Sequence, residues 1–168
     1  MARARYFLVA FGVFLLDQLT KFVVGQSLPL HEGRVIIPGF FNLTHVRNRG
    51  AAFGILSDSP SQTKIFLQVV FSVVALAIIF LLLWRGGANR RSVYGLALIF
   101  GGAVGNLLDR LRQASVVDFL DFHLAGYHWP AFNVADSAIV LGASLLLFDI
   151  IFARTRQESS APDSGAAG

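Results

Sequence analysis

The stretch from Ile65 to Trp84 constrains the fold of this chain more than any other feature. It contains no charged residue, and its only polar side chains are Gln68 and Ser72. Its length matches the roughly 20 helical residues that are needed to cross the hydrocarbon core of a membrane. The stretch is therefore predicted to be a membrane-spanning scaffold helix that faces lipid.

Three further segments are apolar and about long enough to cross a membrane. The four predicted spans lie at about residues 6–24, 64–84, 92–108 and 131–152. The composition agrees, because 55% hydrophobic and 14% charged residues are typical of a membrane protein. The third span is short and rich in small residues, with Gly101 and Gly105 at GxxxG spacing. Such spacing lets a neighbouring helix approach closely, so we expect this span at the centre of the bundle.

The first span has an alternative interpretation as a cleavable signal peptide, because Arg3 and Arg5 precede its apolar stretch. We favour a retained span, since the apolar pattern resumes at Phe22 and no small-x-small cleavage site follows. Asp17 and Lys21 are four residues apart on one helix face and can pair. An ion pair that makes two buried charges tolerable and a direct role in an active site both fit this pattern.

Four spans place both termini on the same side of the membrane. Residues 85–91 pack three arginines into a short loop, whereas the first segment on the other side spreads its basic residues over a much longer stretch. By the positive-inside rule, both termini are predicted to be cytoplasmic. We attribute the net charge of +4 to the orientation of the chain in the membrane. We expect no nucleic-acid partner, because the basic residues form no continuous stripe.

This topology places two outer segments, at about residues 25–60 and 110–130, on the far side of the membrane. In the first, β-branched and aromatic residues flank Pro38-Gly39, which predicts a small sheet with a type II turn on the membrane surface. The small residues of NRGAAFG at 48–54 then leave room for a substrate, although an ordinary tight connection fits them equally. The second segment is rich in aromatic residues and is expected to lie along the interface.

Two aspartates at the membrane border are the strongest candidates for chemistry. They are Asp118 in VVDF and Asp136 in FNVADS. A carboxylate near hydrocarbon costs about 2.5–3.5 kcal/mol on insertion scales, so it usually faces a cavity, pairs with another group or has a function. Two that meet in space can share one proton, which leaves one acid and one base. Asp121 is a rival for Asp118, and spacing alone does not choose between them.

Other catalytic classes fit the sequence poorly, and we predict neither a metal nor a cofactor. The chain has no cysteine, which excludes thiol nucleophiles and thiolate metal sites. His31-Glu32 lacks the second histidine of a zinc-protease motif. No serine lies in a nucleophile-elbow pattern near a histidine. We expect the histidines to be surface or interfacial residues: His31, His45, His123 and His128.

Five motifs follow one another along the chain: DQLTK at 17–21, NRGAAF at 48–53, GGAVGNLLDR at 101–110, VVDF at 116–119 and FNVADS at 132–137. In this order they resemble the signature blocks of bacterial lipoprotein signal peptidase, also called signal peptidase II. The resemblance extends from about Phe14 to Asp149. One departure is Gly54, where serine is expected in many relatives. The implied fold is an all-α membrane protein of four transmembrane helices, with a small extracytoplasmic β-sheet and a short interfacial loop or helix.

The resemblance implies an aspartic endopeptidase of the bacterial inner membrane with its active site near the outer leaflet. Its substrates would be prolipoproteins whose cysteine carries a diacylglyceryl group, cut immediately before that cysteine. Membrane lipids and the cyclic peptide inhibitor globomycin are further implied partners. In this family the catalytic pair occupies the positions of Asp118 and Asp136, which places Asp121 outside it. The family's supporting positions match Asp17, Lys21, Asn48, Gly50, Asn106, Asp109, Arg110, Asn133 and Ala135.

Some alternatives stay open at this level. Asn133 lies one helical turn before Asp136, so it either caps the last helix or holds a carboxylate or the substrate backbone. The buried charged residues also fit a small proton- or ion-coupled transporter or channel subunit, although the chain has no detectable internal repeat. A purely structural subunit would leave the outer carboxylates unexplained. We expect one peptidase domain at residues 1–156 and a disordered tail at 157–168.

Overall fold

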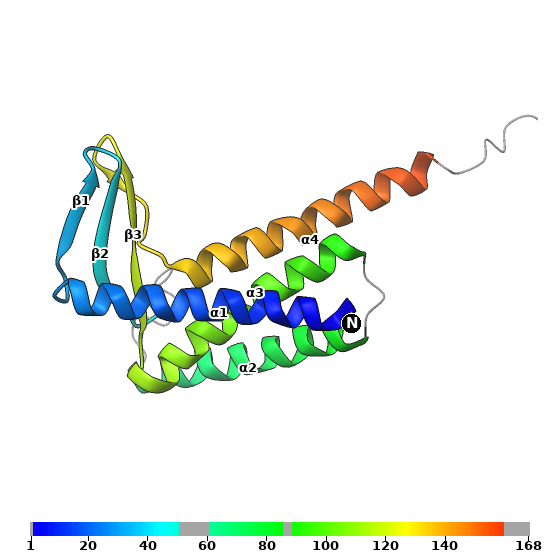
Figure 1. Cartoon of the computed structure of the whole chain (residues 1–168), viewed down its shortest axis with the longest axis horizontal. Coiled ribbons are helices and arrows are strands. Elements are labelled where there is room, and N and C mark those ends of the chain that lie inside the picture. Colours follow the sequence, from blue (N-terminus) through cyan, green and yellow to red (C-terminus); the bar gives the residue numbers. More distant parts are fainter. Residues whose placement is uncertain (1, 51–60, 86–88, 160–168) are drawn as a thin grey trace, which may run out of the picture.

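The computed structural model describes residues 2–50, 61–85 and 89–159. Four of its helices are long and apolar enough to cross a membrane, and a small sheet lies at one end of the helix bundle (Figure 1). The elements in chain order are α1 (Ala2–Ser27), β1 (Gly33–Ile37), β2 (Phe41–Asn48), α2 (Ser61–Arg85), α3 (Arg90–Gln113), β3 (Val116–Leu124), β4 (Tyr127–His128) and α4 (Val134–Ser159). The described start of α1 and end of α4 both lie at the end of the bundle away from the sheet (Figure 1).

The helices extend beyond the apolar runs that predicted them, except at the start of α4. Asn89 caps α3, since its Oδ1 accepts a hydrogen bond from the Ser92 amide at 3.0 Å. This helix continues to Gln113 and is capped by Ala114, whose φ of 53° is left-handed. The prediction that residues 110–113 belong to an outer loop is therefore wrong. The helix α4 begins at 134 instead of 131 and includes residues 157–159. Residues 160–168 and 51–60, which include the end of NRGAAF and Gly54, lie outside the described residues.

The helix α3 contacts the other three helices, which confirms its predicted place at the centre of the bundle. Gly101 lies against the backbone carbonyl of Ala10 in α1, and Gly102 lies against that of Ala135 in α4. A Cβ atom at Gly102 would be only 2.5 Å from the Ala135 oxygen. Glycine therefore allows these backbones to touch, as small residues do at helix interfaces in membranes.

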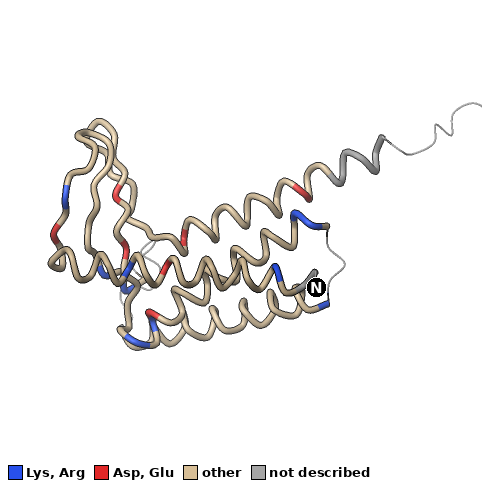
Figure 2. Tube along the Cα trace, in the orientation of Figure 1, with Lys and Arg blue, Asp and Glu red and all other residues tan. Residues whose placement is uncertain are grey.

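The helix α2 has the lipid-facing character that its sequence predicts. Phe66 and Phe71 have exposed fractions of 66% and 76%, and most other side chains along this helix are also exposed or only partly buried. Charged positions concentrate toward the two ends of the bundle and are sparse along the middle of the helices (Figure 2). The outer surface therefore forms an apolar belt of the kind that a bilayer covers.

The four strands form one antiparallel sheet in the order β1-β2-β3-β4. Gly39 has a φ of 75° in the turn between β1 and β2, as the predicted type II turn requires. The second outer segment supplies β3 and β4, so it forms part of the sheet, whereas the sequence predicted only a surface loop there. A bulge in β2 between Leu43 and Val46 places Val46 opposite Asp118.

Backbone hydrogen bonds tie the start of α4 to β3. The amides of Phe119 and Leu120 donate to the Phe132 carbonyl at 3.0 and 2.8 Å, and the Phe132 amide donates back to the Leu120 carbonyl at 3.1 Å. The next residue, Asn133, therefore enters the helix beside the strand that carries Asp118. This junction of sheet and bundle is where the candidate site lies.

Candidate active site

Asn133 joins the two candidate carboxylates. Its side chain is fully buried, and its Oδ1 accepts a hydrogen bond from the Asp136 amide at 2.9 Å, which caps α4. Because the oxygen has this role, the amide nitrogen faces the other way and donates to Asp118 Oδ1 at 2.7 Å. The Asn133 backbone amide also donates to Asp136 Oδ2 at 3.3 Å. The asparagine thus caps the helix and holds a carboxylate, and it places Asp118 and Asp136 on either side of itself.

The second oxygen of Asp118 is held from β2. Asn48 Nδ2 donates to Asp118 Oδ2 at 3.0 Å, while Asn48 Oδ1 accepts from the Gly50 amide at 2.8 Å. Gly50 has a φ of 86°, and a Cβ atom at this position would overlap the side-chain amide of Gln68. Glycine is required here both for backbone conformation and for space.

Burial makes Asp118 an unusual carboxyl. Only 3% of the residue is exposed, and this burial raises its pKa from 3.8 to about 6. The hydrogen bonds from Asn48 and Asn133 oppose the rise, and the negative charge of Asp136 adds to it. Asp118 can therefore exchange a proton in the range where an acid-base catalyst works.

Asp121, the sequence rival of Asp118, differs in both orientation and electrostatics. Three residues separate the two aspartates along β3, so their side chains lie on opposite faces of the strand. Burial also raises the pKa of Asp121, but hydrogen bonds from His128 at 2.9 Å and Asn42 at 3.0 Å outweigh it and hold that pKa below its usual value. Asp121 is an ordinary ionised carboxylate and lies away from Asp136.

Lys21 organises the far side of Asp136. Its buried ammonium contacts Asp17 Oδ2 at 2.8 Å, Asp109 Oδ2 at 2.7 Å and Asn106 Oδ1 at 2.9 Å. Because an ammonium group only donates, Asn106 must present its oxygen to it. The Asn106 amide nitrogen then donates to Asp136 Oδ1 at 2.8 Å. Lys21 therefore positions Asp136 through one intervening amide.

Asp17 links this ion pair to the start of α4. Its Oδ1 accepts a hydrogen bond from the Ala135 amide at 3.0 Å, which satisfies a free N–H group of the first helical turn. Ala135 is fully buried, so the backbone of α4 lies directly against the network. Gln18 adds hydrogen bonds to Asp17 at 3.2 Å and Asp109 at 3.1 Å. Asp17 and Lys21 therefore form a buried ion pair that also contacts the candidate site. The two interpretations that the sequence left open for them are compatible.

Arg110 closes the network on the side of α2. Its Nε donates to Gln68 Oε1 at 3.1 Å and its Nη1 donates to the Asn106 carbonyl at 3.2 Å. The guanidinium lies within electrostatic reach of Asp136 and Asp118. Every supporting residue that the resemblance implies is therefore brought into one connected region around the two carboxylates.

Sequence reasoning missed two members of this network, Gln18 and Gln68. Each is a polar residue in a predicted span, which was the available signal: Gln18 lies between Asp17 and Lys21, and Gln68 interrupts the least polar stretch of the chain. Each also bonds to a charged side chain of α3, a contact that local sequence does not reveal. In the structure both glutamines hold charged side chains in place.

The arrangement suits proton transfer better than nucleophilic or metal catalysis. Among the described residues, the side chains that hydrogen-bond to Asp118 and Asp136 are asparagine amides. Within the described parts of the chain, neither aspartate belongs to a cluster of three metal-ligating side chains. Two carboxyls, one with a raised pKa, can activate a water molecule and protonate a leaving group.

The comparisons with known proteins agree with this geometry. A family model for signal peptidase (SPase) II, Peptidase_A8, matches residues 9–152. The chain belongs to the signal peptidase II family. Members of this family are aspartic peptidases, so this protein is a multi-pass membrane protease of the aspartic class.

The chain matches its relatives and a solved structure over most of its length. It is 51% identical over 152 residues to a lipoprotein signal peptidase of Desulforapulum autotrophicum, covering 90% of this chain and 94% of the relative. A lipoprotein signal peptidase of Solibacter usitatus is 46% identical over 144 residues, covering 85% and 88%. A bacterial membrane enzyme structure determined by the in meso method at 1.9 Å resolution has a TM-score of 0.78 and 32% identity, covering 88% of this chain and 93% of that one.

Proposed function

We propose that this protein removes signal peptides from diacylglyceryl-modified prolipoproteins, cutting immediately before the lipidated cysteine, with Asp118 and Asp136 as the catalytic pair. The observation that carries the proposal is the bridging of these two carboxylates by Asn133 at the junction of sheet and bundle. The substrate class rests on the relatives named lipoprotein signal peptidase.

In the proposed reaction, one carboxylate of the pair takes a proton from a water molecule, which attacks the scissile carbonyl. The protonated partner donates a hydrogen bond to the developing oxyanion and then gives its proton to the departing amine. Asn48 and Asn133 hold both oxygens of Asp118, and Asn106 holds Asp136, so the carboxyls are oriented before substrate binds.

The proposed location is the bacterial inner membrane, with the sheet and the catalytic pair near the outer leaflet and both termini in the cytoplasm. Arg85 ends α2, and Arg90 and Arg91 begin α3, at the end of the bundle away from the sheet, which supports this orientation (Figure 1). A lipidated cysteine keeps its acyl chains in the bilayer, so its peptide bond is held at the depth of the site. We expect globomycin to compete with this substrate.

The transport alternative requires a polar path across the bundle, and the described helices do not provide one. Between Tyr6 and Asp17, α1 contains only apolar residues and Gly12. The residues that pack at the other end include Leu83, Val93 and Leu96, in an apolar core cluster. The polar network stops near the sheet end of the bundle, which favours a site for chemistry over a conducting path.

The direct test is cleavage of a diacylglyceryl-modified prolipoprotein peptide by the purified protein in detergent. We expect Asp118→Asn and Asp136→Asn to lose turnover by at least about 100-fold, the scale of general acid-base catalysis. Asp149→Asn is the matched control, because Asp149 pairs with Arg91 and Ser92 at the opposite end of α4. Full activity of either site variant would remove that residue from the chemistry.

Two further arms of the assay test the substrate and the alternative. Equal cleavage of the lipidated peptide and its unlipidated form would reject the role of the acyl chains in positioning the bond. A wild-type protein that cleaves neither peptide, but carries protons into liposomes, would support the transport alternative instead.

A further inference from the structure

The end of the sheet carries a second group of polar side chains that the proposed reaction does not use. A two-residue turn joins β3 to β4, and its residues Ala125 and Gly126 have φ values of 50° and 83°. Positive φ at both positions is the signature of a tight type I′ hairpin. This hairpin places His123 directly opposite His128. Asp121 lies two residues before His123, so the pleat of the strand puts all three side chains on one face.

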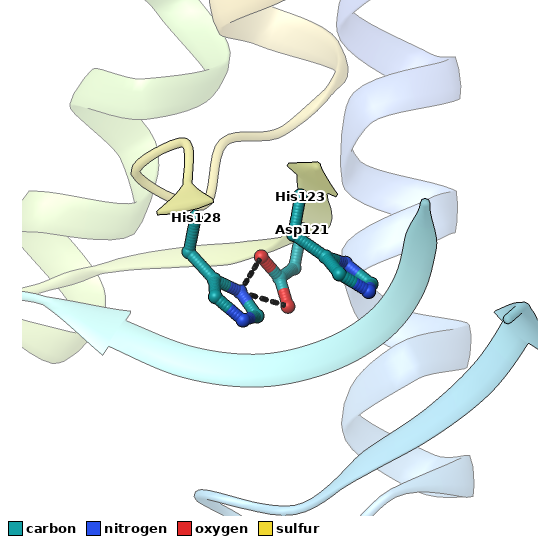
Figure 3. A group of neighbouring side chains, drawn as sticks. All are labelled: Asp121, His123 and His128. Atoms are coloured by element: carbon teal, nitrogen blue, oxygen red, sulfur yellow. Dashed lines mark hydrogen bonds and ion pairs between the residues drawn. The ribbon is translucent and has the colours of Figure 1, made fainter. Parts of the chain in front are cut away.

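The three side chains converge at one point (Figure 3). Their potential ligand atoms all lie within 4.8 Å of one another. The two imidazole rings are stacked, with centroids 4.7 Å apart and an angle of 11° between their planes. Asp121 Oδ1 is 2.9 Å from His128 Nδ1.

Two details distinguish this cluster from an ordinary pairing of surface side chains. His123 Nδ1 is buried and has no hydrogen-bond partner in the described chain, so a buried polar atom is left to be satisfied. Asp121 is buried, with 8% of the residue exposed, and Asn42 Nδ2 donates to its Oδ2 at 3.0 Å. A neighbouring side chain that orients a carboxylate in this way is typical of the surroundings of metal ligands.

We propose that Asp121, His123 and His128 bind one divalent transition-metal ion and that this ion fastens β4 to β3. Two imidazoles and a carboxylate suit Zn²⁺, whereas Ca²⁺ and Mg²⁺ prefer oxygen ligands alone. Three protein ligands leave one tetrahedral position for water.

Binding requires a small rearrangement of the cluster. Ligand atoms at about 2.0–2.1 Å from a tetrahedral Zn²⁺ lie roughly 3.4 Å apart. Separations near the present limit of 4.8 Å must therefore shorten, while the 2.9 Å contact between Asp121 Oδ1 and His128 Nδ1 must open slightly. The side chain of His128 is 55% exposed and can rotate, while Asp121 is held by Asn42. The movement therefore falls on His128. The strand β4 is only two residues long, so a metal link across the hairpin adds to a weak pairing.

The metal site does not take part in the proposed proteolysis. Asp121 projects from the face of β3 opposite to Asp118, so an ion bound there does not reach the catalytic pair. The sequence predicts that no metal takes part in catalysis. A metal that only fastens the hairpin is compatible with that prediction. Its consequences are measurable in binding and stability, independently of peptide cleavage.

The test uses the full-length protein without a histidine tag, stripped of metal with EDTA and titrated with Zn²⁺ against a chromophoric chelator. We expect one ion per chain for the wild type. His128→Ala should weaken binding at least tenfold, and it is a safe substitution because that side chain is largely exposed. Asn42→Ala should weaken binding by about 10- to 100-fold through Asp121. His31→Asn is the matched control, since His31 is an exposed histidine outside the cluster, and asparagine tolerates its positive φ of 69°.

Two results would overturn the proposal. One is Zn²⁺ binding of the same affinity and stoichiometry in the wild type and in His128→Ala. The other is a thermal unfolding midpoint that Zn²⁺ raises equally in both proteins, or in neither. Co²⁺ provides a check on the geometry, because the visible absorption of a tetrahedral site should appear in the wild type and in His31→Asn and be absent from His128→Ala.

Discussion

Replacing Gly102 with alanine tests whether close contact between α3 and α4 positions the proposed catalytic pair. The new Cβ atom would lie 2.5 Å from the backbone oxygen of Ala135, whereas ordinary contact begins at 3.4 Å. The first turn of α4 must therefore move by up to about 0.9 Å. Asp136 follows Ala135 directly, so its carboxylate moves with that turn.

The expected effect is on the rate as well as on stability. Overpacking costs about 1–3 kcal/mol, and alanine returns up to about 1 kcal/mol through its higher helix propensity. The net loss of stability is therefore about 3 kcal/mol or less. A misplacement of about 1 Å can cost 100-fold in rate. We expect kcat for the lipidated peptide to fall by about 10- to 100-fold in Gly102→Ala while the protein stays folded.

The matched control is Gly12→Ala, the same chemical change in α1. A Cβ atom at Gly12 meets nothing within 4 Å. Both variants are assayed for kcat and KM with the lipidated peptide and for thermal unfolding in the same detergent. A kcat for Gly102→Ala equal to that of Gly12→Ala would refute the reasoning, because it would show that the start of α4 can move without affecting the reaction.

Three further predictions concern charge, pH and metal. Lys21→Met leaves Asp17 and Asp109 buried without their cation, so we expect a loss of about 3–5 kcal/mol in the free energy of unfolding; an unchanged denaturation midpoint would contradict it. Asn48→Ala removes a hydrogen bond that lowers the pKa of Asp118, so that pKa should rise above about 6. The basic limb of the pH–rate profile should then move to higher pH by about one pH unit. A shift of this limb to lower pH would contradict the sign of the effect. Treatment with EDTA should leave kcat for the lipidated peptide within about twofold, because in the part of the chain that the structure describes the hydrogen bonds to the proposed catalytic pair come from amides. Complete loss of turnover on chelation would place a metal in the chemistry.

The membrane-spanning helices and the first hairpin were the most predictable parts of the fold. A run without charge such as Ile65 to Trp84 has few alternatives to a spanning helix, and Pro38-Gly39 specifies its turn locally. The strand β3 was not predicted, because polar residues interrupt the apolar pattern of VVDFLDFHL and because its pairing partner, β2, lies about seventy residues earlier. Long-range pairing of this kind leaves little local signal.

The candidate site shows the same division between local and tertiary information. The sequence identified Asp118 and Asp121 as rivals, and only the resemblance to a family chose between them. Their opposite faces on β3 follow once the segment is known to be a strand. The difference in their environments comes from Asn48, Asn133 and His128, which lie on three other elements or at their ends. Local sequence carries no information about such neighbours.

The network separates charges that stabilise the fold from charges that are proposed to react. Lys21 forms ion pairs with Asp17 and Asp109, and its contact with the rest of the site passes through the neutral amide of Asn106. Asp118 is likewise held by neutral amides, which orient its oxygens without adding a positive charge beside them. A cation in direct contact with Asp118 would lower its pKa and oppose the effect of burial. The use of asparagine at each of these contacts therefore explains how a buried carboxyl can be held firmly in place and still be available as an acid.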